Sequence, residues 1–424
     1  MKVKSLKFLS NYKQFKKGQI FNFGDDFEEK KTTKNTNFSV LVGRNGSGKT
    51  TLMSLIPNLF HHIERYIGNI HADFELIYTI KQLNQDTEVK ISHYKNLIRI
   101  TIPEVYENVQ LVPKRSPTSN NFKFINRTDS YIDYSEFHQY TPFSVVTSTF
   151  SLHGEYPNPR PKNFIGSQIV SDQTITSIYG RNHYKIGSIS RGLLRFVKLF
   201  YESNSEIKEL LKLFDLKFTN RLLYRDLGEE ARWITINEQW ISKNDSKIQA
   251  VEAYLNDIEF ERYGQKICLT NMSSGEKMLL LRALSILNSI ENNSIVIIEE
   301  PELHLDEIWN KQLITLFKIL YKNYNSHIII ATHNYSIINT VPQTNLIALK
   351  NGIQEKIYGN TFLASYDEIF RVLYGDDFKI NKVEEEYLLS ISEKSVPQLK
   401  EDYKLLGNSI YKYLVYKKIK EKRK

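Results

Sequence analysis

A short β-rich run, residues 38–42, leads directly into a glycine-rich segment, and a helical pattern follows at once. The segment, residues 43–50, reads GRNGSGKT. After it, leucine and isoleucine recur at helical spacing over residues 52–59. A strand that enters a glycine turn and leaves as a helix is typical of α/β folds, in which helices cover a parallel sheet. This junction therefore predicts an α/β protein.

The glycine-rich segment matches the G-x-x-x-x-G-K-[ST] pattern of a phosphate-binding loop. Its glycines let the backbone turn tightly, so that N–H groups and the N-terminus of the following helix face an anion. We expect Lys49 to reach the β- and γ-phosphates of ATP and the Thr50 hydroxyl to bind Mg²⁺. The residues expected to contact the nucleotide here are Gly43, Asn45, Gly46, Ser47, Gly48, Lys49, Thr50 and Thr51.

Two acidic residues follow a second apolar run, residues 295–298, which predicts a central buried strand. Glu300 is placed to act as the general base that activates a water molecule. Glu299 takes the position where such strands usually carry a metal-binding Asp, and we expect it to reach Mg²⁺. The alternative is a pair of exposed acids that merely ends a strand.

His333 follows a third apolar run, residues 327–330, which predicts another parallel strand. A histidine at the end of a strand beside the acidic strand can hydrogen-bond the γ-phosphate and sense its loss. Taken alone, such a histidine is more often structural. Its position after Glu300 favours the sensor role, so we count Lys49, Glu300 and His333 as the catalytic candidates.

A serine–glycine turn, Ser273-Ser274-Gly275-Glu276, precedes a predicted helix over residues 277–287. Such a turn can bind an anion through its N–H groups and hydroxyls. The alternative is an ordinary helix N-cap in which Glu276 completes a capping box. The segment by itself does not distinguish the two.

Together, the phosphate loop, the SSGE segment, the acidic strand with EEPELHLD and the histidine resemble the ATP-binding-cassette (ABC) class of ATPases. In that class, ATP lies between the phosphate loop of one subunit and the SSGE-type signature of the other. The resemblance implies that Ser273, Ser274 and Gly275 contact the γ-phosphate in the partner's site. It also implies a contact between subunits at Asp306.

The sequence EPELHLD further resembles that of RecF-like and overcoming-lysogenisation-defect-like AAA-family ATPases, with Asp306 in place of their second histidine. Residues 5–15 resemble their first strand and the turn after it. The resemblance covers residues 1–60 and 265–350. The compact size and the inserted lobe also resemble ATPase subunits of bacterial anti-phage systems of the Septu or retron-linked type.

The pattern of apolar and polar residues divides the chain into four parts. Residues 1–154 are expected to form the first part of the ATPase core, with the phosphate loop, a helix that Pro57 bends or ends, and an antiparallel β-meander over residues 74–112. Residues 155–264 are expected to form a helical insertion lobe. Residues 265–360 complete the core, a mixed sheet flanked by helices, and residues 361–424 form a helical basic extension. The resemblance to the ABC class also implies a glutamine after the strand that precedes the lobe. No clear candidate for it is present, and Ser148 or Thr149 can stand in for it.

Composition limits the cellular compartments and the binding partners that we expect for the chain. The 424 residues carry a formal net charge of +9, which permits contact with nucleic acid but is equally a solvated basic surface. The single cysteine, Cys268, cannot form a disulfide framework or a cysteine zinc site. We find no signal peptide and no apolar run of membrane-spanning length. We therefore expect a cytoplasmic protein with no membrane partner.

The favoured function is a Mg²⁺-dependent ATPase that forms a homodimer, or a higher homo-oligomer, around ATP. No D-x-D pair follows His333, so a nuclease of the toprim type is not expected within the chain. We expect a separately encoded effector, such as a nuclease, as its partner in anti-phage defence. Two alternatives remain: a RecF-like repair ATPase that acts on DNA directly, and a nucleotide-gated scaffold with negligible turnover, which Glu299 in place of Asp keeps open.

Overall fold

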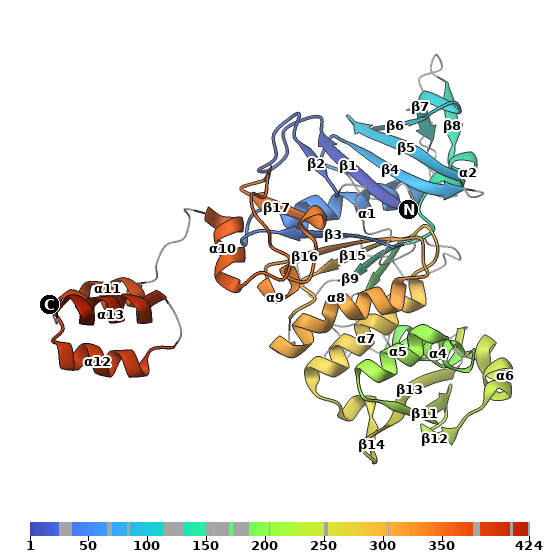
Figure 1. Ribbon diagram of the computed structural model, residues 1–424. Helices are drawn as coiled ribbons and strands as arrows, with labels where there is room; N and C mark the ends of the chain where they lie inside the picture. Colours follow the sequence, from blue (N-terminus) through green and yellow to red (C-terminus); the bar gives the residue numbers. More distant parts are fainter. Residues whose placement is uncertain are drawn as a thin grey trace. The chain divides into compact units, whose positions relative to one another are not determined.

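The computed structural model describes most of the chain, and it divides into two compact units, Met1–Ile369 and Phe370–Lys424 (Figure 1). The described residues are 1–24, 36–65, 70–82, 85–112, 130–148, 156, 169–172, 186–202, 204–249, 253–303, 305–375, 382–407 and 410–422. Thr149, one candidate for the glutamine position, lies outside them, as does most of 155–185.

The N-terminal part of the chain forms a seven-stranded sheet with the order β2-β1-β4-β5-β6-β7-β8. All neighbours pair antiparallel except β7 and β8. The predicted meander is confirmed, because its alternating apolar residues are buried on one face. The strands are β1 (Lys2–Phe8), β2 (Ile20–Asn22), β4 (Phe74–Gln82), β5 (Gln85–Tyr94), β6 (Leu97–Ile102), β7 (Tyr106–Val112) and β8 (Tyr131–Asp133).

A second seven-stranded sheet lies at the centre, with the order β10-β9-β15-β16-β3-β17-β18. Its strands run parallel except for β18 at one edge. Strands β15 and β16 are buried along their whole length, as expected for a parallel sheet covered on both faces. The strands are β3 (Asn37–Val42), β9 (Val145–Ser148), β10 (Ile169–Asp172), β15 (Ile295–Glu299), β16 (His327–Thr332), β17 (Leu346–Lys350) and β18 (Ile353–Glu355).

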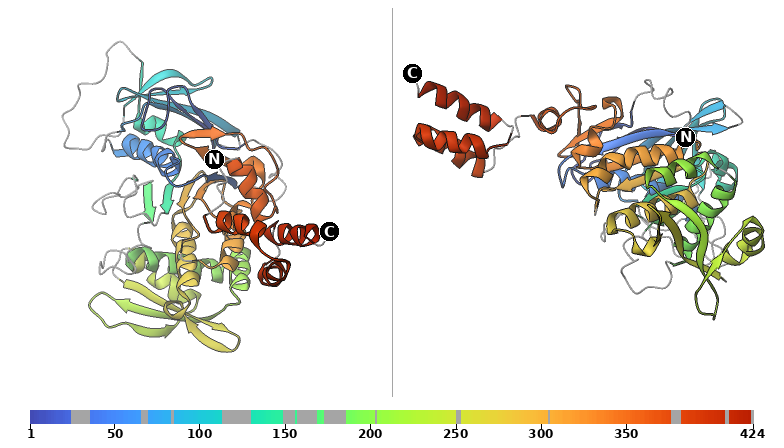
Figure 2. Two further views of the ribbon diagram at one scale, coloured as in Figure 1. Left: turned by 90° about the vertical axis from the view of Figure 1, so that its left-hand side faces the viewer. Right: turned by 60° about the horizontal axis from the view of Figure 1, so that its bottom comes forward.

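Helix α1 (Lys49–Arg65) lies between the two sheets in Figures 1 and 2. The prediction that Pro57 bends or ends this helix is wrong about its end, because the helix continues to Arg65. A proline inside a helix costs about 3 kcal/mol. Burial of apolar side chains against both sheets, including Leu52, Ile56 and Phe60, outweighs that cost.

The other face of the central sheet is covered by α7 (Ser274–Ser289) and α8 (Glu307–Tyr321), below which lies the inserted lobe (Figures 1 and 2). Short elements complete this unit around the sheets. They are α2 (Tyr134–Phe137), η2 (His138–Tyr140), η4 (Leu269–Asn271), α9 (Tyr335–Ile338) and η5 (Gln343–Asn345).

The lobe is not purely helical, which corrects the expectation for residues 155–264. Its described part combines α4 (Ile186–Tyr201), α5 (Ser205–Leu213) and α6 (Glu238–Gln249) with a four-stranded antiparallel sheet of order β12-β11-β13-β14. Phe196 of α4 contacts Phe218 and Phe260 of this sheet, with ring centroids 5.8 and 6.0 Å apart. The strands are β11 (Lys217–Asp226), β12 (Arg232–Thr235), β13 (Ala253–Arg262) and β14 (Gln265–Cys268).

The second unit is helical, as predicted for the C-terminal extension. Its helices α11 (Lys382–Glu393), α12 (Val396–Leu405) and α13 (Ile410–Glu421) share a small core of Ile391, Leu399, Val415 and Ile419. The boundary between the two units falls within the residues of helix α10 (Tyr366–Tyr374). The domain boundaries at 154, 264 and 360 remain predictions.

Candidate ATP-binding site

The phosphate loop connects β3 to α1 and depends on its glycines. Gly46 and Gly48 have φ angles of 79° and 101°, which side-chain-bearing residues rarely adopt. A Cβ at Gly43 would lie 2.4 Å from the carbonyl oxygen of Leu349. The loop is therefore built for glycine at these positions, as the sequence pattern predicted.

Gln14 and Phe15, which sequence reasoning did not select, pack directly on this loop. A Cβ at Gly48 would lie 2.3 Å from Gln14 Nε2 and 2.8 Å from Phe15 Cζ. Gln14 also lies against Gly352, whose N–H donates to the Ser47 carbonyl at 3.1 Å. The turn after β1 thus supports the loop from one side. The only sequence signal was the aromatic turn at residues 11–15.

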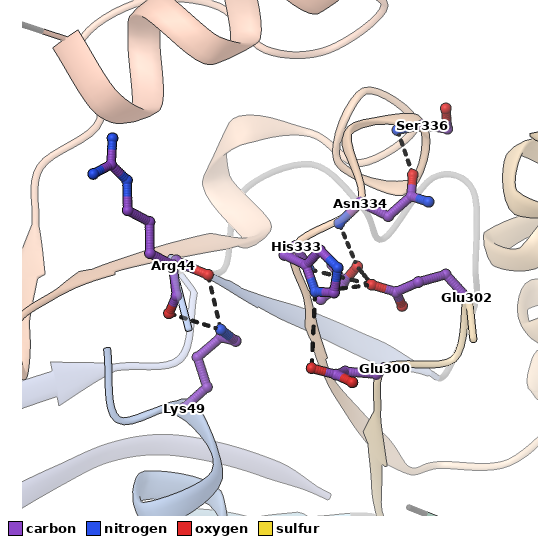
Figure 3. A network of polar contacts seen from close by, with 9 residues as sticks. Arg44, Lys49, Glu300, Glu302, His333, Asn334 and Ser336 are labelled. Atoms are coloured by element: carbon purple, nitrogen blue, oxygen red, sulfur yellow. Dashed lines mark hydrogen bonds and ion pairs between the residues drawn. The ribbon is translucent and has the colours of Figure 1, made fainter. Parts of the chain in front are cut away.

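Lys49 is buried at the start of α1. Its ammonium donates to the carbonyl oxygens of Gly43 at 2.8 Å and Arg44 at 3.2 Å (Figure 3). Burial lowers the pKa of Lys49, and the carboxylates of Glu300, Glu299 and Glu302 oppose that shift. A buried cation that faces three carboxylates is suited to binding phosphate oxygens, which would replace the two loop carbonyls as its partners.

The acidic strand β15 brings its two glutamates to the same edge of the sheet. Glu299 is the last residue of β15 and is buried. Glu300 follows with φ at 41°, a left-handed conformation that is unfavourable for glutamate. Its N–H donates to the Ala331 carbonyl of β16 at 2.8 Å, which holds this conformation in place. The Glu300 side chain, 38% exposed, is accessible to a water molecule.

His333 follows β16, beside Glu300, as predicted. Its Nδ1 lies 3.8 Å from Glu300 Oε1 and 3.7 Å from Glu302 Oε1 (Figure 3). Glu302 is a residue that sequence reasoning missed. It accepts hydrogen bonds from Thr332 Oγ1 at 2.6 Å and from the His333 N–H at 3.3 Å. Its place within EPELHLD was the available signal.

The signature segment begins α7 at the lobe, and Figures 1 and 2 show that end of α7 apart from α1. Ser273 caps the helix, and Glu276 completes a capping box, so the ordinary structural interpretation is present. Glu276 also pairs with Arg262 of β13 at 2.9 Å, which ties the segment to the lobe. Ser273 and Ser274 are nevertheless exposed, and their expected role toward a partner's ATP remains a prediction.

Asp306 is exposed at the start of α8, where its carboxylate accepts from the Trp309 N–H at 2.9 Å and caps the helix. Its predicted contact between subunits remains a prediction. Asn45 is exposed on the phosphate loop and Thr51 is buried in the first turn of α1. Ser148 ends β9, next to β15.

The phosphate loop has an unpartnered polar atom that a bound nucleotide would satisfy. The buried Ser47 hydroxyl has no hydrogen-bond partner within the described part of the protein, and it lies at the loop where a phosphate oxygen would accept from it. Thr50 and Glu299 are the residues that would hold Mg²⁺. Among the described residues no group of three or more His, Cys, Asp or Glu side chains is arranged to bind a metal by itself. This donor set suits Mg²⁺, which usually takes few protein ligands and completes its shell with phosphates and water.

The chain is similar to several known proteins. Residues 188–339 match the family profile described as "AAA domain, putative AbiEii toxin, Type IV TA system". The chain is 21% identical over 404 residues to the Retron Ec83 probable ATPase of Escherichia coli. The alignment covers 81% of this chain and 71% of that protein.

Solved structures similar to the chain include the SMC head domain from Thermotoga maritima, with 14% identity, a TM-score of 0.40, and coverage of 84% of this chain and 97% of that chain. The recombination mediator RecF of the RecFOR pathway is similar at 12% identity, with a TM-score of 0.37 and coverage of 84% and 98%. No helix in the described ranges is long and apolar enough to cross a membrane. The phosphate loop, the acidic strand and the histidine lie at one edge of the parallel strands, an arrangement that resembles the core of ABC-type ATPases, and the chain is similar in sequence to the retron probable ATPase.

Proposed function

We propose that two copies of this chain close on ATP, hydrolyse it, and thereby gate a separately encoded effector in bacterial anti-phage defence. The observation that carries the proposal is the division of the site. Lys49, Glu300 and His333 lie together at one edge of the central sheet (Figure 3), whereas Ser273 and Ser274 of the signature are exposed at the lobe. A second copy in the opposite orientation can supply the missing signature, as C2 symmetry allows.

Each candidate site residue has a defined role in this proposal. Lys49 and the N–H groups at the start of α1 neutralise charge on the β- and γ-phosphates. The Glu300 carboxylate accepts a proton from the attacking water. His333 donates a hydrogen bond to the γ-phosphate and loses this contact after hydrolysis. Thr50 and Glu299 would hold Mg²⁺, which would supply electrostatic stabilisation of the charge that develops on the phosphoryl group.

The role in defence is supported by two resemblances. The relative named above is described as the probable ATPase of a retron. The profile match is described in terms of a toxin–antitoxin system. Neither gives the identity of the effector, and we propose a nuclease on the resemblance to ATPase subunits of the Septu and retron-linked type.

ATP turnover of the wild-type chain, compared with Glu300→Gln and with an exposed control, Glu385→Gln, tests the hydrolase. We expect Glu300→Gln to lose roughly 100- to 10,000-fold in kcat and the control to match the wild type. Equal turnover in all three proteins would contradict the role of Glu300. No turnover in any of them would favour the nucleotide-gated scaffold.

Mixing two inactive variants tests the shared site. Lys49→Ala disables a phosphate loop and Gly275→Glu disables a signature, so each variant alone should be inactive. In a mixed dimer, the intact loop of one chain faces the intact signature of the other. We expect the mixture to recover about a quarter of wild-type turnover, since half of the dimers are mixed and each keeps one of two sites. No recovery after mixing would argue against a site formed between subunits.

A further inference from the structure

Glu302 connects the end of the acidic strand to the end of the histidine strand. The residue is 7% exposed. Its Oε1 accepts hydrogen bonds from Thr332 Oγ1 at 2.6 Å and from the backbone N–H of His333 at 3.3 Å. A buried carboxylate that accepts two hydrogen bonds is held in one orientation. Glu302 therefore fixes the backbone from which His333 projects.

The imidazole of His333 lies between two carboxylates. Its Nδ1 is 3.7 Å from Glu302 Oε1 and 3.8 Å from Glu300 Oε1 (Figure 3). Both distances exceed that of a hydrogen bond, so a small rotation toward either carboxylate would form one. A hydrogen bond to Glu300 would occupy the carboxylate that has to accept a proton from water. A hydrogen bond to Glu302 would leave that carboxylate available.

The second carboxylate oxygen of Glu302 is able to accept a further hydrogen bond. Oε2 is buried and has no hydrogen-bond partner among the residues that the structure describes. A buried carboxylate oxygen without a donor is unfavourable, and such atoms are rare in folded proteins. The His333 Nδ1 lies 3.7 Å from the other oxygen, Oε1, so a small rotation away from Glu300 would bring a donor to this carboxylate.

We propose that Glu302 is a positioning residue for the switch histidine: it holds the His333 backbone and competes with Glu300 for the His333 imidazole. This inference rests on the proposed ATPase function and adds a regulator of its general base. Glu300 remains the group that accepts the proton. Glu302 acts on the reaction only through His333.

The kinetic test separates this role from a structural one. Glu302→Gln keeps an oxygen that can accept from Thr332 and from the His333 N–H, but it removes the negative charge that competes for the imidazole. We expect kcat to fall roughly 10- to 100-fold, as for other carboxylates that orient a functional histidine, with KM for ATP within about twofold of wild type. In a His333→Ala background, Glu302→Gln should have little further effect.

The control is Glu307→Gln, an exposed glutamate of the neighbouring helix that contacts Ser336 and not His333. It should keep wild-type kcat. A Glu302→Gln variant with wild-type kcat, or losses that simply add in the double variant, would overturn the proposal.

Backbone hydrogen exchange measures the hydrogen bond between the His333 N–H and Glu302, and it does not require ATP turnover. In Glu302→Ala, the His333 amide loses its acceptor, so the peptide that contains Thr332 to Ser336 should exchange faster, whereas Glu302→Gln should keep it protected. If the wild-type chain hydrolyses no ATP, the proposed function fails, but this exchange pattern still decides whether Glu302 positions His333. Unchanged exchange in Glu302→Ala would refute the positioning role. If Glu302→Ala does not fold, Glu302→Asp, whose shorter side chain withdraws the acceptor, replaces it.

Discussion

The left-handed backbone of Glu300 predicts that the general base costs the protein stability. Its φ is 41°, and a side chain in this region costs about 1–2 kcal/mol relative to glycine. Glycine also has a more flexible unfolded chain, which costs about 0.4–1 kcal/mol relative to alanine. Glu300→Gly should therefore be more stable than Glu300→Ala by about 0.5–1 kcal/mol, although both variants lose the carboxylate and with it the turnover.

Urea titration of the two variants measures this difference, because their side chains differ by one methyl group only. The matched control is the same pair at Lys243, an exposed residue in the middle of α6. There the order should reverse, with alanine more stable than glycine by about 1 kcal/mol. If alanine is also the more stable residue at position 300, the left-handed conformation is not present in solution and the argument for strain at the base fails.

Three further changes have defined outcomes. Burial lowers the pKa of His327 from 6.5 to about 3, so the stability that this neutral side chain supports is complete above pH 6.5 and is lost as the pH falls toward 3, by about 1.4 kcal/mol per pH unit. His327→Asn should flatten this dependence in urea titrations over that range, and an unchanged slope would refute the assignment. Gly48→Ala should abolish ATP binding in calorimetric titrations, and adding Gln14→Ala should restore part of it, because the new Cβ would lie 2.3 Å from Gln14 Nε2. Asp306→Ala should lose about 1 kcal/mol of stability as the cap of α8 is removed, whereas Asp306→Asn should keep it; equal stability of the two would contradict the cap.

The lobe shows where pattern reasoning loses accuracy. Leu193, Leu194 and Val197 recur at helical spacing, and they lie in α4. Residues 217–226 fall within the lobe that is expected to be helical, yet they form β11, in which Phe218, Leu222 and Tyr224 are buried. These three residues are two and four positions apart, as in a strand, but the polar Asn220 between them and the apolar Leu223 beside them hide the alternation in the sequence.

The sequence by itself determined the parts of the site that depend on neighbouring residues. A strand, a glycine turn and a helix place Lys49, and two apolar runs followed by Glu300 and His333 predict adjacent parallel strands. Their carboxyl ends share one edge of the sheet, so these side chains meet without any further information. The exposed turn before α7 was likewise visible as either a cap or an anion site.

Only the tertiary structure decided the contacts between residues far apart in the chain. Gln14 supports the phosphate loop, Glu302 accepts from Thr332, and the backbone of Glu300 is held in a left-handed conformation by Ala331. Pro57 remains inside a helix for the same reason, because packing between two sheets outweighs its local preference. Local pattern selects an element and its exposed face, whereas side-chain partners and backbone strain are set by packing that no single segment contains.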